Sequence, residues 1–100
     1  MLAQLKKGIL ELCILKILLR GETYGYPLIQ EMKQLFEDTD ESTFYSILRR
    51  IKAEGLADSY EKPSSEGPVR KYYVITPLGK EKLNQMCKEL GRMKDIVDSI

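Results

Sequence analysis

The fold is decided by the stretch from Asp40 to Gly79, which reads DESTFYSILRRIKAEGLADSYEKPSSEGPVRKYYVITPLG. In its first part the apolar residues recur at i, i+3, i+4 and i+7, and they are Phe44, Ile47, Leu48 and Ile51. This spacing predicts an amphipathic helix. Asp40 is a suitable N-cap for it, and Gly55 is the residue type expected where a chain leaves a helix in a left-handed conformation.

After Gly55 the pattern becomes extended. Leu56 to Lys62 and Arg70 to Thr76 predict two strands, the second rich in Tyr, Val and Ile. Pro63 to Pro68 predicts a loop too long for a two-residue hairpin turn. We expect cations from both strands at a shared rim, where they could meet phosphates: Lys62, Arg70 and Lys71.

A helix, a hairpin and the start of a second helix, in that order, form the layout of a winged helix. The predicted fold is therefore mainly α with a small β-hairpin wing, and double-stranded DNA becomes the first partner to test. The outward side of the predicted helix is rich in hydrogen-bond donors that could enter a major groove. The candidate DNA-binding residues on it are Ser42, Thr43, Tyr45, Ser46 and Arg49. An alternative interpretation of Arg49 and Arg50 is that they are solvated charges paired with Glu41 or Glu54.

Two further helices precede this stretch. The segment from Leu5 to Leu19 is apolar around most of its circumference, so such a helix must be covered on two sides. A second helix is expected to begin near Thr23 to Tyr26 and to run to about Glu37, with Pro27 in its first turn.

The last segment, from Pro77 to Ile100, carries apolar residues at alternating spacings of three and four, which is the pattern of a heptad repeat. They are Leu83, Met86, Leu90, Met93, Val97 and Ile100. One interpretation is a terminal helix packed on its own domain. We favour a dimerisation helix that packs with the first helix and the partner chain, with Leu10 and Ile14 also at the interface. The predicted organisation is a winged helix-turn-helix DNA-binding domain over residues 1–76 and a dimerisation helix over 77–100.

The composition limits other functions. The chain has 100 residues, a formal net charge of +1 and no His, so any DNA-binding surface must be local. Cys13 and Cys87 lie in apolar helical patterns without CxxC spacing, and we expect buried reduced thiols rather than a metal site. The sequence shows no catalytic motif, and we expect neither an enzyme nor a bound cofactor. Its apolar runs lack the features of a signal peptide or a membrane span, which predicts a cytoplasmic protein without membrane association.

Several short motifs, in order and spacing, resemble the PadR-like family of bacterial transcriptional regulators. They are Gly21, Tyr24-Gly25-Tyr26, Ser42-Thr43-Phe44-Tyr45 with Leu48 and Arg49, Glu54-Gly55-Leu56, Arg70-Lys71-Tyr72-Tyr73 with Ile75-Thr76, and Gly79. The resemblance implies a dimeric winged-helix repressor that a small molecule releases from its operator. Ser46 stands where many members have Pro, and Pro27 where a polar or acidic residue is usual. The last helix lacks the Trp that multidrug-binding relatives place there, and Leu90 occupies that region.

The apolar content of the outer helices and the balanced net charge each fit two interpretations. The Met and Leu content of the first and last helices would suit a cavity for a hydrophobic small-molecule effector at the dimer interface, and a packed, ligand-free interface is equally consistent. A winged helix can also act as a protein–protein interaction module without specific DNA binding, which the balanced charge would suit.

Overall fold

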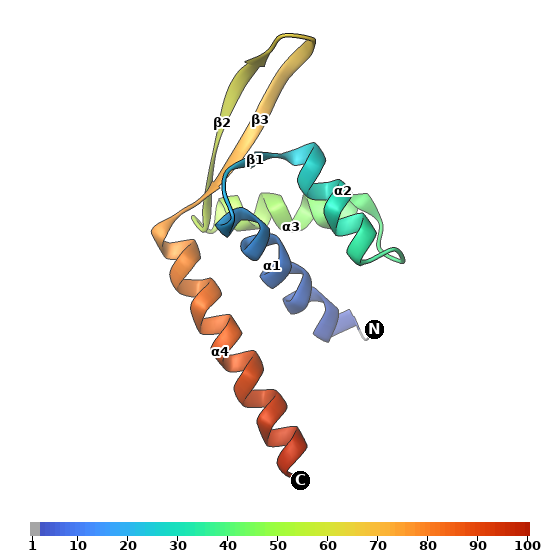
Figure 1. Cartoon of the computed structure of the whole chain (residues 1–100), viewed down its shortest axis with the longest axis vertical. Helices are drawn as coiled ribbons and strands as arrows, with labels where there is room; N and C mark the ends of the chain where they lie inside the picture. The colour runs from blue at the N-terminus through green and yellow to red at the C-terminus, as the bar shows by residue number, and fades with distance from the viewer. Residues whose placement is uncertain (1–2) are drawn as a thin grey trace.

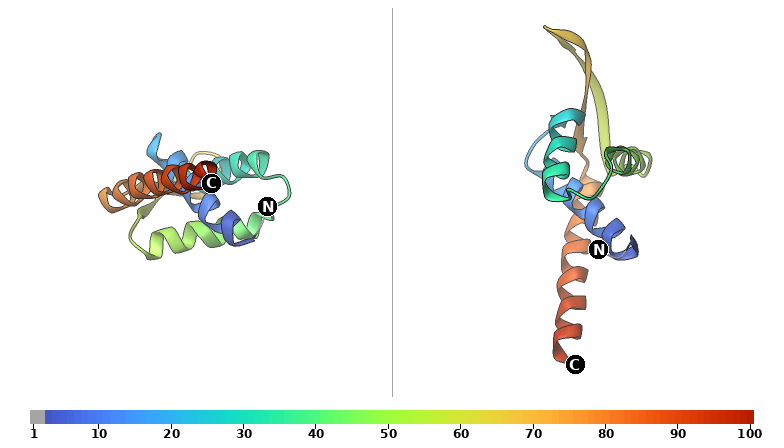
Figure 2. Two further views of the ribbon diagram at one scale, coloured as in Figure 1. Left: turned by 90° about the horizontal axis from the view of Figure 1, so that it is seen from below. Right: turned by 90° about the vertical axis from the view of Figure 1, so that its right-hand side faces the viewer.

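A computed structural model describes residues 3–100 of the chain (Figure 1). The elements in order are α1 (Ala3–Leu19), β1 (Thr23–Tyr24), α2 (Gly25–Leu35), α3 (Glu41–Ala53), β2 (Ala57–Ser64), β3 (Gly67–Ile75) and α4 (Pro77–Ser99). Helices α1, α2 and α3 form the body, the hairpin of β2 and β3 projects from one end of it, and α4 projects from the other (Figures 1 and 2). The first two residues of the predicted 1–76 region lie outside the described residues.

The core lies between α1, α2, α3 and one face of the sheet. Phe44, Leu48 and Ile51 of α3 are almost completely buried, as the apolar spacing of that helix predicts. They pack in one cluster with Ile14 of α1 and Ile29 of α2. Because this side of α3 is anchored in the core, its opposite side is turned to solvent.

The ends of α3 and the start of α4 are fixed by short local contacts. Asp40 is the N-cap residue of α3 as predicted, although its carbonyl rather than its side chain accepts the hydrogen bond, from the Thr43 amide at 3.0 Å. Gly55 has a φ of +75°, which places the following chain for the hydrogen bond from Leu56 N to Ile51 O. A Cβ at Gly79 would lie 2.0 Å from the Leu56 carbonyl oxygen, so only glycine lets α4 start this close to the end of α3.

The sheet has three antiparallel strands in the order β1-β3-β2. The two-residue strand β1, where Thr23 pairs with Tyr73 and Tyr24 with Tyr72, was not predicted. The predicted long loop from Pro63 to Pro68 is wrong: Ser64 pairs with Gly67, and the turn holds only two residues between them. The register shifts between Lys62 and Ser64, because Pro63 has no N–H to donate and is accommodated in an irregularity of the strand.

The burial of the heptad residues divides α4 into two parts. Leu83 is buried and Met86 packs against the core, whereas Leu90, Met93, Val97 and Ile100 are exposed. On α1, Leu10 and Ile14 are 2% and 0% exposed within the single chain. Leu10, Ile14 and Leu83 are therefore core residues and not the dimer-interface residues we predicted.

The two cysteines differ from the expectation of buried thiols. Cys13 is half-buried, and this burial raises the pKa of its thiol. Cys87 is exposed on α4, so for this residue the prediction is wrong. Among residues 3–100, no helix is both long and apolar enough to cross a membrane.

Candidate nucleic-acid interface

The outward side of α3 carries all five candidate residues that were predicted on this helix, and each of them is exposed. We call them the reading face: Ser42, Thr43, Tyr45, Ser46 and Arg49. Within residues 3–100, no carboxylate oxygen lies within 4.0 Å of the Arg49 guanidinium. This guanidinium is available to an external acceptor.

Arg50, the next residue, has a different environment. Its Nη2 lies 3.1 Å from Oε2 of Glu11 on α1, and not beside Glu41 or Glu54. Lys82 of α4 lies 3.0 Å from the other Glu11 oxygen and 3.5 Å from Glu54, and its pairing with the Glu11 carboxylate raises the pKa of Lys82. This charged cluster joins α1, α3 and α4, and Arg50 is one of its members.

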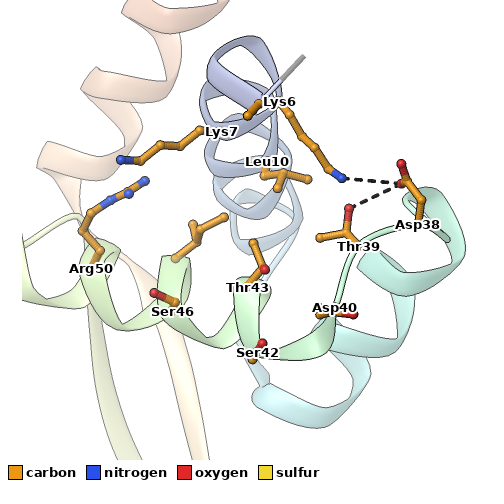
Figure 3. Close-up of a pocket in the computed structure, with 12 residues that line it drawn as sticks. Lys6, Lys7, Leu10, Asp38, Thr39, Asp40, Ser42, Thr43, Ser46 and Arg50 are labelled. Carbon is orange, nitrogen blue, oxygen red and sulfur yellow. Dashed lines mark hydrogen bonds and ion pairs between the residues drawn. The ribbon is translucent and has the colours of Figure 1, made fainter. Parts of the chain in front are cut away.

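One flank of the reading face borders a hollow of about 650 Å³ between α3 and the first turns of α1 (Figure 3). Thr43 and Ser46 line it from α3, and Lys6 and Lys7 line it from α1. The Lys6 ammonium lies 3.6 Å from Asp38, which partly neutralises this wall. Thr43 also lies on the same side of α3 as the buried Ile47, four residues later, which places it at the margin of the reading face.

The other flank borders a hollow of about 410 Å³ that reaches the hairpin. Tyr45 lines it from α3, Tyr26 from α2, and Lys71 and Tyr73 from β3. Tyr26 is 63% exposed and was not among the predicted site residues. Its sequence signal was weak, because a single Tyr near the start of a helix is equally consistent with the core.

The predicted cations lie on two faces of the hairpin, which we call the wing (Ala57 to Ile75). Lys62 is directly opposite Arg70 in the ladder, so their side chains share one face. Lys71 is opposite Glu61 on the other face, the side on which Tyr73 enters the core. The shared rim we predicted therefore holds Lys62 and Arg70 but not Lys71.

Aromatic rings support both cations of the first pair. The Lys62 ammonium nitrogen lies 4.6 Å from the centre of the Tyr72 ring, and Arg70 Cζ lies 4.5 Å from the centre of the Tyr24 ring. The Lys71 ammonium is 5.9 Å from the Tyr73 ring. Lys62 also has Glu22 at 3.7 Å, whereas within residues 3–100 no carboxylate lies within 4.0 Å of Arg70 or Lys71.

A second surface of interest lies at the opposite end of the body, between α1 and α4. Leu5, Ile9 and Leu12 of α1 line a hollow of about 280 Å³ with Met86, Leu90 and Met93 of α4. Farther along α4, Ile96 and Val97 are also exposed, Val97 to 70%. The periodicity of the last helix predicted the α4 part of this apolar surface. It missed Leu5, Ile9, Leu12 and Ile96.

Comparison with known proteins agrees with this arrangement. The model of the transcriptional regulator PadR-like family matches residues 14–85. An uncharacterized protein of Lysinibacillus sphaericus is 34% identical over 95 residues, which cover 92% of this chain and 87% of that protein.

Solved structures show the same fold. A PadR-like transcriptional regulator from Bacillus cereus is 38% identical with a TM-score of 0.82, and the match covers 97% of this chain and 95% of that one. A PadR family transcription regulator from Clostridium difficile is 30% identical with a TM-score of 0.79, over 90% and 95% of the two chains. The winged-helix prediction is thereby confirmed, as is the expectation of a regulator rather than an enzyme. The chain belongs to the PadR-like family of transcriptional regulators.

Proposed function

We propose that this regulator is a sequence-specific DNA-binding repressor that works in the cytoplasm and binds a twofold-symmetric operator as a homodimer. One observation carries the proposal: a member of a transcriptional regulator family exposes a donor-rich helix face beside a wing whose Arg70 and Lys71 have no carboxylate partner within residues 3–100. A helix of this kind fits a major groove, and such cations fit the flanking phosphates.

The two parts of the interface have different tasks in this proposal. Ser42, Ser46 and Arg49 read base edges from the centre of the reading face, and Thr43 and Tyr45 lie at its margins. Arg49 is suited to a guanine, because its guanidinium can donate two hydrogen bonds to O6 and N7. Lys62, Arg70 and Lys71 bind backbone phosphates, which fixes orientation and supplies most of the sequence-independent affinity.

The dimer forms, in this proposal, through the apolar surface at the other end of the molecule. Residues 1–76 make the DNA-binding domain, and α4 (77–100) is the dimerisation helix. The interface comprises Leu90, Met93, Val97 and Ile100, together with Leu5, Ile9 and Met86 at the groove. An exposed apolar row of this length on a 100-residue chain is typical of an association surface. Half-sites would lie about 34 Å apart, one turn of B-DNA.

Release by a hydrophobic small molecule belongs to the same proposal. The hollow between α1 and α4 is lined mostly by Leu, Ile and Met side chains, and a second chain would close it further. A ligand there would change the separation of the two reading faces by changing how the α4 helices pack.

A protein–protein interaction module is the second candidate. The exposed end of α4 would suit a partner protein, and the net charge of +1 gives no general attraction to DNA. The salt dependence separates the two candidates, because only phosphate binding releases condensed counterions.

The first test is fluorescence anisotropy with duplex DNA from the region upstream of the protein's own gene and with a scrambled duplex. We expect tighter binding to the upstream duplex, and we expect that preference to persist at near-physiological salt. Equal weak binding to both would point to an operator elsewhere. No binding at low salt to either duplex would contradict the proposal and favour the protein-interaction candidate.

A further inference from the structure

Three tyrosines from three strands lie side by side on one face of the sheet. The ladder pairs Tyr24 of β1 with Tyr72 of β3, and Tyr72 with Tyr60 of β2. The centres of the Tyr60 and Tyr72 rings are 5.7 Å apart and the rings are nearly parallel, whereas the Tyr24 and Tyr72 rings are 5.4 Å apart and tilted by 52°. We call Tyr24, Tyr60 and Tyr72 the tyrosine platform.

The pair of wing cations rests on this platform. Lys62 follows Tyr60 by two residues, so its side chain is on the same face, and its ammonium lies over Tyr72 at 4.6 Å and over Tyr60 at 5.6 Å. Arg70 precedes Tyr72 by two residues and crosses to the Tyr24 ring at 4.5 Å. A ring face attracts a cation without neutralising it. Each cation is thus held in place and still able to bind an anion.

Glu22 provides a carboxylate that partly neutralises Lys62. Its carboxylate lies 3.7 Å from the Lys62 ammonium, and it accepts a hydrogen bond from the Tyr60 hydroxyl. A phosphate that binds Lys62 must displace this carboxylate or share the Lys62 ammonium with it. In a complex with DNA, Glu22 would therefore compete with a phosphate for Lys62.

We propose that Tyr24, Tyr60 and Tyr72 are positioning residues that hold Lys62 and Arg70 ready for backbone phosphates, and that Glu22 weakens this contact. The inference rests on the proposed DNA-binding function. It adds that aromatic rings restrain the side chains of the two wing cations before DNA binds. Holding a long side chain in its binding conformation lowers the entropy lost on association. The platform raises affinity without adding charge.

The main test compares Tyr72→Leu with Tyr72→Phe by anisotropy on the upstream and scrambled duplexes at several salt concentrations. Tyr72→Phe keeps the ring, and the hydroxyl of Tyr72 donates no hydrogen bond to residues 3–100, so binding should equal that of the wild type. Tyr72→Leu should weaken binding to both duplexes by about fivefold to thirtyfold. Its salt slope should stay at the wild-type value, because no charge is lost.

Arg70→Ala is the reference variant, because it removes a charged phosphate contact itself. It should also weaken binding to both duplexes, but the magnitude of its salt slope should fall by about 0.9 for each phosphate contact removed. A slope that falls equally in Tyr72→Leu would contradict a positioning role.

Two further variants keep the test decisive should Tyr72→Leu lose its fold. Tyr24→Leu removes the ring under Arg70, which is also a neighbour of the Tyr72 ring, and leaves the two rings near Lys62 in place. It should weaken binding with an unchanged salt slope. Glu22→Gln should have the opposite effect and strengthen binding to both duplexes by about twofold to fivefold, because a phosphate no longer competes with a carboxylate for Lys62. A general disturbance of the wing would weaken binding in both variants.

The outcomes separate this inference from the proposed function. If the wild type binds DNA and neither tyrosine variant differs from it, the positioning role is wrong and the DNA-binding function stands. If the wild type binds neither duplex at low salt, the proposed function is wrong and the platform inference falls with it.

Discussion

The reading face of α3 and the wing differ in how their side chains are supported. On the reading face, Ser42, Ser46 and Arg49 project from a helix that the core holds rigidly, and no other side chain restrains the Arg49 guanidinium by an ion pair within residues 3–100. On the wing, the backbone is a hairpin that leaves the body, and its cations are held by aromatic rings instead.

This difference fits two separate tasks. Reading base edges needs an accurately placed backbone and short polar side chains whose hydrogen bonds have strict geometry. Binding phosphates needs charge at the right position and tolerates small shifts in the backbone. Under the proposed function, the core would meet the first need and the tyrosine platform the second.

The largest expected effect comes from loss of the second subunit. It should weaken the DNA contacts of the reading face and of the wing to the same extent. Met93→Asp places a charge on the apolar surface of α4 and should convert the proposed dimer to a monomer. Binding to a full twofold site should fall by about 100-fold or more, because the two half-sites are no longer linked. Sedimentation gives the oligomeric state and anisotropy the affinity.

Lys88→Asp, a charge change on an already charged position of α4, is the matched control for this variant. It should stay dimeric. A Met93→Asp protein that is still a dimer at micromolar concentration would contradict the assignment of the interface.

Removing both cations of the platform should weaken binding to every duplex. Lys62→Ala combined with Arg70→Ala should lower affinity by about 10- to 100-fold at near-physiological salt. The magnitude of the salt slope should fall by about 3.6 for the four contacts of a dimer, at about 0.9 each. The ratio of affinities for upstream and scrambled duplexes should stay close to the wild-type ratio.

Arg49→Ala should have a smaller effect of a different kind. Loss of a guanidinium that donates two hydrogen bonds to one base should lower affinity for the upstream duplex by about 10-fold and for the scrambled duplex much less. The same assay measures it. Equal losses on both duplexes would place Arg49 with the phosphate-binding residues.

Arg50→Ala tests the neighbouring position, where we expect an effect on stability. Glu11 is only 8% exposed, and it would lose one of its two cationic partners. The free energy of unfolding should fall by about 1 to 3 kcal/mol, measured by chemical denaturation at a fixed protein concentration. Unchanged stability with a large loss of DNA affinity would mean that Arg50 belongs to the reading face.

The smallest effect is expected for Ser46→Ala. This change removes one hydroxyl from the centre of the reading face and should alter the ranking of operator variants by a few fold, on the order of one hydrogen bond. Competition among duplexes that differ by single base pairs measures it. The unfolding free energy should change little, since Ser46 is exposed.

The sequence was most informative where one helix side is apolar and the other polar. The spacing of Phe44, Ile47, Leu48 and Ile51 was enough to orient α3 and hence its reading face. On α1, which is apolar nearly all round, periodicity could not tell which side faces the core. Leu10 and Ile14 were therefore assigned to a dimer interface, although Leu5 and Ile9 lie toward the exposed groove.

The wing shows a second limit of sequence patterns. The Pro-rich composition of 63–68 predicted a long loop, because a single sequence does not reveal that a register shift can accommodate Pro63 within a strand. The two-residue strand β1 is too short to produce any pattern, and its stability comes from pairing with β3. The tyrosine platform depends on both features and was therefore not predictable, although each of its residues was visible.

Sequence-specific reading by α3 is tested best by selecting bound duplexes from a random-sequence library with the wild-type protein at near-physiological salt. We predict enrichment of one inverted repeat whose half-site centres lie about one helical turn apart, and relaxed selection at the base pair that Arg49 contacts when the library is screened with Arg49→Ala. Recovery of unrelated sequences without a common motif would contradict sequence-specific reading by α3.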